Sequence, residues 1–321
     1  MSEVTVGARI HLGFSSLSLG HDRIYGAAGL GLEDPSVKVR AQPASEVNCG
    51  HELGRVFANR SVDVLGLPGA EVTVEDDLPR HVGLGSGTQL ALAVYTAIAR
   101  SHDLDPSVRQ HSPSLGRGGR SGVGVATFER GGFILDAGHP TDSFTPTSPN
   151  IGEWRVPDVI CRHEVPENWR IILGIPDATP GRFGEDEANA MRSTLQNVEP
   201  ESADKAAGII LRKLLPGIVE GNIDRFGAAA YELGQLNGKW FSETGVQEDT
   251  YRPPANRIIR ALSHHDCIAG VGQSSWGPAI YAFTTRSQVT NAKKAVDDAV
   301  SSVGGGSVRA VKPRNEGARN A

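Results

Sequence analysis

Three glycines stand directly before a run with helical periodicity in the segment GLGSGTQL. Gly83, Gly85 and Gly87 remove three β-carbons within five residues, so backbone N–H groups can turn toward one point at a helix start. Such a point binds anions, because unsatisfied donors and the helix dipole both favour negative charge. Ser86 and Thr88 add hydroxyl donors or a helix cap. The segment predicts a phosphate site, although a capped turn that uses glycines for tight packing has the same pattern.

A second glycine-rich segment, GRGGRSG, places two cations close together. Arg117 and Arg120 flank Gly118 and Gly119, which let the backbone approach a ligand, and Ser121 follows them. Guanidinium forks match phosphate and carboxylate oxygens in bidentate fashion. We therefore expect these residues to bind an anionic substrate group; the alternative is a basic, solvated turn.

Two further pairs carry groups suited to acid–base chemistry. Arg9 and His11 are two residues apart in a strand-like run, so both project from one face. If that face opens on the site, Arg9 holds an anion and His11 donates to it or transfers a proton, although a strand histidine is often structural. Asp136 and His139, in LDAGH, form a candidate acid–base or metal-supporting pair; the alternative is that Asp136 only forms a turn at the end of the strand.

The elements that must position these residues are short strands and helices. Residues 5–19, 29–41 and 70–78 have strand-like patterns bounded by glycine and proline. The run after the glycine loop is helical, with apolar residues at i, i+4 and i+8. Residues 124–138 predict a hairpin around two glycines. Residues 140–168, rich in Pro, Ser, Thr and Asp, predict a domain crossover.

At 321 residues the chain is long enough for two domains, which we place at 1–155 and 156–321. The second half opens with a buried-strand pattern at 168–178, followed by helical stretches at about 203–215, ended by a proline, and 218–236. An α-β-β-α-β order then resembles a split βαβ, ferredoxin-like sandwich. The last nine residues, PRNEGARNA, predict a disordered tail.

Charge and cysteine use exclude several classes of protein. The net charge is −5 and the pI is near 6.1, so the chain lacks the basic excess that binds nucleic acid. Three widely spaced cysteines suggest neither a zinc site nor a disulfide framework, which fits a reducing cytoplasm. The N-terminal segment has no signal-peptide pattern and no apolar span. We expect a cytoplasmic protein with no nucleic-acid or membrane partner.

Two motifs carry a family resemblance. No lysine follows the last glycine of the loop, which rules out a Walker loop, and its glycine spacing differs from the dinucleotide fingerprint. LPRHVGLGSGTQL instead resembles the P-x-x-x-G-L-G-S-S/G motif of the GHMP kinase superfamily, and IAGVGQSSWGPAIYAF resembles its third motif. The resemblance implies a two-domain α+β GHMP-kinase-like fold, with an N-terminal domain like ribosomal protein S5 domain 2, a ferredoxin-like C-terminal domain, and an active site between them.

Within that superfamily, ARIHLGFSSL and LGRGGRSGVGVATFERGGFILDAGH resemble the β-ribofuranosylaminobenzene 5′-phosphate synthase (β-RFAP synthase) family. The resemblance implies a homodimeric, decarboxylating phosphoribosyltransferase of tetrahydromethanopterin biosynthesis. Its substrates would be phosphoribosyl pyrophosphate (PRPP) and 4-aminobenzoate or 4-hydroxybenzoate, its products CO2, pyrophosphate and a C-riboside 5′-phosphate, and its cofactor Mg²⁺ without pyridoxal phosphate (PLP).

Two alternatives stay open. One is an ATP-dependent small-molecule kinase of the same superfamily, which Gly124 opposes because mevalonate-type kinases carry an aspartate at the corresponding position. The other is a non-catalytic phosphate or nucleotide binder.

The resemblance also implies further candidate residues for the substrate and metal sites. Asp22 and Arg23 match a family position that carries an Asp or Asn and an Arg. Ser274 and Ser275 lie where GHMP folds close the substrate pocket, and their hydroxyls would bind phosphate or carboxylate; a polar β-turn is the alternative. The metal ligands are not identified, with Glu185, in an acidic helix start, as a weak candidate.

Overall fold

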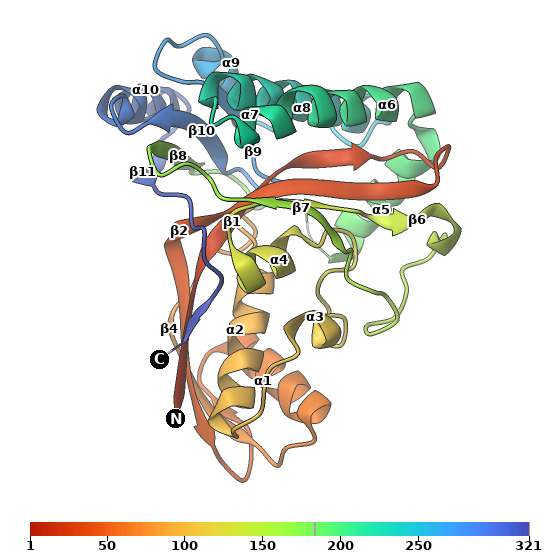
Figure 1. The fold of residues 1–321 in the computed structure, drawn as a ribbon, viewed down its shortest axis with the longest axis vertical. Coiled ribbons are helices and arrows are strands. Elements are labelled where there is room, and N and C mark those ends of the chain that lie inside the picture. The colour runs from red at the N-terminus through yellow and green to blue at the C-terminus, as the bar shows by residue number, and fades with distance from the viewer. Residues whose placement is uncertain (183, 321) are drawn as a thin grey trace.

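The chain folds around two β-sheets, and a long hairpin of the first sheet lies against the helices of the second half (Figure 1). The computed structural model describes residues 1–182 and 184–320. The first sheet pairs its strands antiparallel except for β3 with β4. Its strands are β1 (Ser2–Ser16), β2 (Arg23–Pro43), β3 (Asn48–Cys49), β4 (Ala70–Asp76), β5 (Phe133–Asp136), β6 (His139–Pro140), β7 (Val159–His163) and β12 (Arg319–Asn320).

The helices of the first half pack around α2, which contacts β1, β2 and α1. Every residue from Gln89 to Ala99 of α2 is buried, so the predicted apolar stripe is part of a helix that is covered on all sides. The helices here are α1 (Glu52–Leu65), α2 (Ser86–Ser101), α3 (Val108–His111) and α4 (Val123–Arg130), with a 3₁₀ turn at Thr141–Ser143.

The second sheet is antiparallel, with the order β11-β8-β10-β9. Numbered along the chain this order is 4-1-3-2, with helices between the first and second and between the third and fourth strands, which confirms the ferredoxin-like arrangement. The strands are β8 (Trp169–Pro176), β9 (Gly270–Gln273), β10 (Ile280–Thr285) and β11 (Gly306–Val311). The helices are α5 (Gly184–Asn197), α6 (Pro200–Ile209), a π-helical turn (Ile210–Leu214), α7 (Leu215–Val219), α8 (Ile223–Glu243), α9 (Ala255–Leu262) and α10 (Val289–Ser301).

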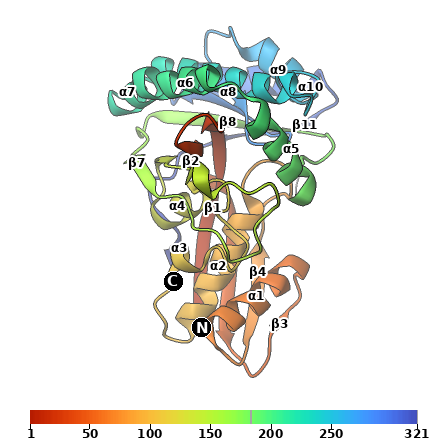
Figure 2. The same cartoon turned by 90° about the vertical axis from the view of Figure 1, so that its right-hand side faces the viewer.

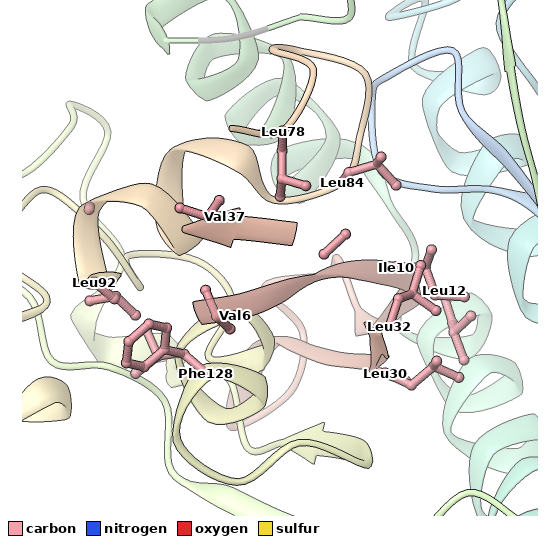
Figure 3. Packing of buried hydrophobic residues seen from close by; sticks show 14 of the residues in the cluster. Val6, Ile10, Leu12, Leu30, Leu32, Val37, Leu78, Leu84, Leu92 and Phe128 are labelled. Atoms are coloured by element: carbon pink, nitrogen blue, oxygen red, sulfur yellow. The ribbon is translucent and has the colours of Figure 1, made fainter. Parts of the chain in front are cut away.

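The β1–β2 hairpin ties the two halves together. Figures 1 and 2 show its strands passing beneath the layer of α6, α7 and α8, and β1 contacts both α6 and α8. The Phe14 amide donates to Asn237 Oδ1 (2.5 Å), and Asn237 Nδ2 donates to the Phe14 carbonyl (3.1 Å). One hydrophobic cluster includes residues from both halves. Figure 3 shows part of it, with Val6, Ile10, Leu12, Leu30, Leu32, Leu78 and Leu84 among the labelled side chains.

The predicted hairpin across 124–138 is wrong. Val123–Arg130 forms helix α4, and only Phe133–Asp136 forms a strand. Six consecutive residues of α4 are buried, and such all-round burial hides the periodicity by which a helix is recognised. Gly131 and Gly132, with φ of 60° and 78°, turn the chain between helix and strand.

The predicted disorder of the C-terminal tail is also wrong for its described residues, 313–320. Arg319 and Asn320 pair with β1, and the Arg314 side chain is only 3% exposed, with Nη1 3.2 Å from Glu33 Oε2. Polar composition alone does not show that a tail finds buried partners elsewhere in the fold.

Helix α1 and strand β7 lie where no element was predicted. The α1 helix has a clear start and stop, because His51 Nδ1 accepts from the Gly54 amide and Gly66 takes a left-handed conformation after the last turn. Strand β7 pairs with β5, so it belongs to the first sheet although it follows the predicted boundary at residue 155. That boundary stays a prediction. Among the described residues, no helix is both long and apolar enough to span a bilayer.

Candidate active site

A cavity of about 740 Å³ is walled by both halves of the chain. Its walls come from β1, from the loops before α2 and α4, from the start of α5 and from the loop between β9 and β10. Most of the site residues predicted from the sequence line it together: Arg9, His11, Gly83, Gly85, Ser86, Gly87, Thr88, Arg117, Gly118, Gly119, Arg120, Ser121, Glu185 and Ser275.

The glycine loop leads into the first turn of α2 at this cavity. Gly83 and Gly85 have φ of 101° and 79°, which favour glycine, and Gly85 precedes the helix as its cap. The Arg9 amide donates to the Leu84 carbonyl (3.1 Å), while the buried Leu84 side chain joins the core (Figure 3). The Thr88 amide donates to the Gly85 carbonyl (3.0 Å), which leaves the amides of Ser86 and Gly87 as the first donors of the helix, and this first turn carries no acidic residue. Amide donors and a positive dipole end therefore face the cavity.

Two arginines lie directly against these glycines. A β-carbon at Gly85 would be 3.0 Å from Cγ of Arg9, and one at Gly87 would be 3.1 Å from Nη1 of Arg117. Arg9 Nη1 also donates to the Gly83 carbonyl (2.7 Å). Burial lowers the pKa of both guanidiniums to about 10, so both stay charged at neutral pH. The glycines thus let two desolvated cations approach the helix start, where they attract anions more strongly than in water.

Arg117 has a hydrogen-bonding group left for a ligand. Its Cζ lies 4.9 Å from the centroid of the Phe57 ring, and its carbonyl accepts from Trp154 Nε1 (2.8 Å). Its Nε atom is buried and has no hydrogen-bond partner among the described residues. A buried donor without a partner is costly, which is consistent with a bound anion as the missing acceptor.

Glu187, on α5, is an acidic residue in this basic cavity that the sequence analysis missed. Its Oε1 lies 2.9 Å from Arg120 Nη2, and its charge raises the pKa of Arg9 and Arg117 against the larger effect of burial. Glu185 lines the same cavity. Six arginines and two glutamates are among the lining residues, so the cavity carries an excess of positive charge suited to a polyanion.

Other lining residues were also missed. Arg80 and His81 precede the glycine motif and Trp276 follows the serine pair, so proximity to the motifs was the available signal. Trp154 lies in the predicted domain crossover, residues 140–168, where no motif marked a site residue. The remaining missed residues include Phe14, Tyr25, Leu53, Arg182 and Arg192.

His11 is a neutral, buried imidazole beside Arg9. Burial, and then the charge of Arg9, lower the pKa of His11 to about 3. Its ring centroid lies 4.6 Å from that of Phe14, and its Nε2 is buried without a hydrogen-bond partner among the described residues. His11 can therefore exchange a hydrogen bond with a ligand as a neutral group, but it does not carry a proton as imidazolium near pH 7.

Asp136 and His139 do not line the cavity. The Asp136 carboxylate is 1% exposed and accepts from the amides of Ala27 (3.0 Å), Gly122 (2.7 Å) and Gly138 (2.9 Å). Burial raises the pKa of Asp136, and these hydrogen bonds act against that rise. The contacts place Asp136 as an anchor of the chain leading into α4, while His139 is a half-buried residue of β6.

The two predicted serines occupy different places. Ser274 is buried, and its Oγ donates to the Gly83 carbonyl (2.7 Å) and accepts from the His11 amide (3.0 Å), so it joins the third motif to the glycine loop and β1. Ser275 lines the cavity with a φ of 56°.

Asp22 and Arg23 lie outside the cavity lining and are exposed. Arg23 donates to the carbonyls of Ala137 (2.6 Å) and Gly138 (3.0 Å). These bonds hold the turn after β5 against the start of β2.

The described residues contain no group of three or more His, Cys, Asp or Glu side chains placed to hold a metal ion. Mg²⁺, however, usually takes one or two carboxylates and completes its shell with substrate phosphates and water. Glu185 and Glu187, which line a cavity with an excess of arginines, fit that kind of partial site.

Comparisons with known proteins agree with this architecture. The GHMP kinases N terminal domain family matches residues 53–132, and the GHMP kinases C terminal family matches residues 214–302. Among solved structures, mevalonate pyrophosphate decarboxylase from Streptococcus pyogenes has a TM-score of 0.68 at 11% identity, covering 98% of this chain and 97% of that one. Homoserine kinase from Cytophaga hutchinsonii has a TM-score of 0.67 at 17% identity, covering 99% and 97%. These likenesses show the fold.

Curated relatives are more informative. The chain is 35% identical over 292 residues to β-ribofuranosylphenol 5′-phosphate synthase of Archaeoglobus fulgidus, covering 88% of each chain. It is 32% identical over 302 residues to the protein of that name from Methanothermobacter thermautotrophicus, again covering 88% of each. The chain therefore belongs to the β-ribofuranosylphenol 5′-phosphate synthase family of the GHMP kinase superfamily.

Proposed function

We propose that this protein joins PRPP to a 4-substituted benzoate and releases CO2 and pyrophosphate, forming a C-riboside 5′-phosphate. Membership of the family supports a riboside phosphate synthase role, and the curated relatives are named for a ribofuranosylphenol 5′-phosphate. The single observation that carries the proposal is the meeting of the open start of α2 with the half-buried guanidiniums of Arg9 and Arg117. Such a constellation suits a departing diphosphate.

The donor half of the reaction needs stabilisation of a leaving group. Ribosyl transfer breaks the C1–O bond with oxocarbenium character, so negative charge grows on the pyrophosphate. The amides of the first turn of α2, with Arg9 and Arg117, stabilise that charge where it develops. Arg120 and Arg192 also line the cavity and supply cations for the 5′-phosphate and for the acceptor carboxylate.

The acceptor half needs an apolar wall beside these cations. The rings of Phe14 and Tyr25 lie 6.0 Å apart at the cavity, with His11 against Phe14. A para amino or hydroxyl group makes the carboxyl-bearing ring carbon nucleophilic, and that carbon attacks C1 of the ribose as the C1–O bond breaks. The carboxylate then leaves as CO2, and its bonding pair restores the aromatic ring. No PLP is needed as an electron sink.

We also propose that Mg²⁺ enters with the diphosphate. Glu185 and Glu187 are the carboxylates that line the cavity, and Glu187 would have to share its carboxylate between Mg²⁺ and Arg120. When bound, Mg²⁺ would neutralise part of the charge that grows on the diphosphate oxygens.

The deciding experiment supplies Mg²⁺, PRPP and 4-hydroxybenzoate or 4-aminobenzoate labelled in the carboxyl group. We expect labelled CO2 and pyrophosphate in equal amounts, and loss of most of this activity in Arg117→Met. Arg155→Met is the matched control, because Arg155 is 84% exposed and lies outside the cavity lining. ADP formation from ATP with an alcohol substrate, or ligand binding without either product, would overturn the proposal.

The kinase outcome is the less favoured of these. Gly124 lies in α4 against Thr88, where a β-carbon would be 3.1 Å from Thr88 Cγ2. The chain thus offers neither a carboxylate at this position nor ample room for one.

A further inference from the structure

A small cavity of about 60 Å³ borders the large one. The two share His11, Phe14, Ser275 and Trp276 as lining residues, and the rest of the small cavity comes from β1, from α8 and the loop that follows it, and from the end of β9. Because four residues line both cavities, we call the small one the side pocket of the proposed active site.

The side pocket differs from the main cavity in its chemistry. Among the described residues, no Arg, Lys, Asp or Glu lines it. Two of its polar atoms are nonetheless buried without a hydrogen-bond partner, the hydroxyl of Tyr251 and Nε2 of His11. Tyr251 is 6% exposed, and its hydroxyl lies against Gly234 of the pocket wall, where a β-carbon would be 2.7 Å away. Orphaned polar groups at a pocket predict a polar, uncharged ligand group.

Other polar side chains of this wall already have partners. Asn237 binds the backbone of Phe14 through both its oxygen and its nitrogen. Gln247 Nε2 donates to the Thr250 carbonyl (2.9 Å), and Gln273 Nε2 donates to the Gly277 carbonyl (2.9 Å). Unlike these three side chains, Tyr251 and His11 each have a polar atom without a partner, so they are the groups that can bind a ligand.

We propose that the side pocket receives the para substituent of the acceptor, an amino or hydroxyl group, and that the Tyr251 hydroxyl binds it. The inference rests on the proposed function. The carboxyl-bearing carbon forms the new bond, so that end of the ring faces the ribosyl donor and the arginines of the large cavity. The para substituent is at the opposite end, which directs it past Phe14 and Trp276 into the side pocket.

The size of the pocket fits this role. An apolar cavity of about 150 Å³ accommodates benzene, so 60 Å³ is too small for the whole ring and sufficient for a substituent with the ring edge. The uncharged lining of the side pocket also suits the para substituent. When the ring attacks, the para group donates electrons and becomes partly positive, and the pocket offers two neutral groups, the Tyr251 hydroxyl and the His11 imidazole, instead of a cation.

The test compares Tyr251→Phe with Tyr281→Phe. Tyr281 is fully buried and also has an orphaned hydroxyl, but it lines neither cavity. Its charge also raises the pKa of Tyr251, so the Tyr281 variant tests whether loss of a neighbouring hydroxyl outside the pocket has the same effect. Calorimetry measures the Kd of 4-hydroxybenzoate, 4-aminobenzoate and unsubstituted benzoate for each protein. We expect the wild type to prefer the substituted acids, Tyr251→Phe to reduce that preference about tenfold with benzoate binding unchanged, and Tyr281→Phe to retain it.

The outcomes separate this inference from the proposed function. A preference unchanged in Tyr251→Phe, or reduced equally in both variants, would overturn the pocket assignment and leave the proposed function standing. Failure of the wild type to bind any of the three acids would overturn the proposed acceptor class, and the pocket assignment with it.

Discussion

Arg9, which is half-buried, and His11, which is buried, both lie on β1, yet their desolvation leaves them in different charge states at neutral pH. The guanidinium stays a cation because its pKa is lowered only to about 10, whereas the imidazole stays neutral because its pKa is lowered to about 3. A fixed cation beside a fixed neutral group suits a site in which an anion leaves on one side and an aromatic ring binds on the other.

The depressed pKa of His11 predicts a pH dependence of stability. Its folded-state pKa of about 3 lies below the ordinary value of 6.5, so the unfolded chain takes up this proton first as pH falls. Stability is therefore lost as pH falls from 6.5 toward 3. Between pH 6 and pH 4, the free energy of unfolding should fall more steeply for wild type than for His11→Gln, by up to about 1.4 kcal/mol per pH unit. Denaturant unfolding at several pH values measures both slopes, and parallel slopes would contradict the burial argument.

At the scale of elements, the glycine loop and α2 form the anion site because the loop is pinned on both sides. Arg9 holds the carbonyls of Gly83 and Leu84, and Ser274 holds Gly83 again from the second half of the chain. Missing β-carbons then let guanidiniums, instead of the loop's own side chains, occupy the space at the helix start.

Substitution of Gly87 by alanine tests this use of space. Alanine suits the first turn of a helix, but its β-carbon would be 3.1 Å from Nη1 of Arg117 and would displace the guanidinium. We expect the affinity for pyrophosphate to fall about tenfold in calorimetry, with no loss of folding stability. The matched control is Gly208→Ala in α6, where a β-carbon would be 3.1 Å from Nη1 of Arg212 outside the cavity lining. Equal affinities of both variants would refute the role of Gly87.

At the scale of the whole molecule, the site exists because the two halves are held in one arrangement. Phe14 and Asn237 join β1 to α8, and Ser274 joins the β9–β10 loop to β1 and to the glycine loop. Both cavities lie across this junction. The predicted homodimer and cytoplasmic location stay predictions.

Ser274→Ala should weaken both the junction and the site. It removes the acceptor of the His11 amide and the donor to the Gly83 carbonyl, so we expect about 1–3 kcal/mol lower free energy of unfolding together with weaker pyrophosphate binding. Ser112→Ala is the control, because Ser112 is equally buried but its Oγ donates to the Val108 carbonyl within one turn of chain (2.7 Å). Denaturant unfolding and calorimetry report the two effects. A Ser274→Ala variant that loses stability but keeps full affinity would show that the junction does not shape the site.

The sequence by itself determined the features that depend on neighbouring residues. The strands around Arg9, the glycine loop with its helix, and the order of elements in the second half follow from local periodicity and motif spacing and are present in the structure. The predicted helix end at the proline is wrong, because Pro216 lies inside a helical run that continues to Val219. Only the tertiary structure decided that Asp136 anchors backbone outside the cavity, that Glu187 pairs with Arg120, and that an orphaned Tyr251 borders a side pocket. These three features depend on contacts between residues far apart in the chain, so no local pattern encodes them. Helix α4 was missed for another reason, because its burial on all sides hid its periodicity.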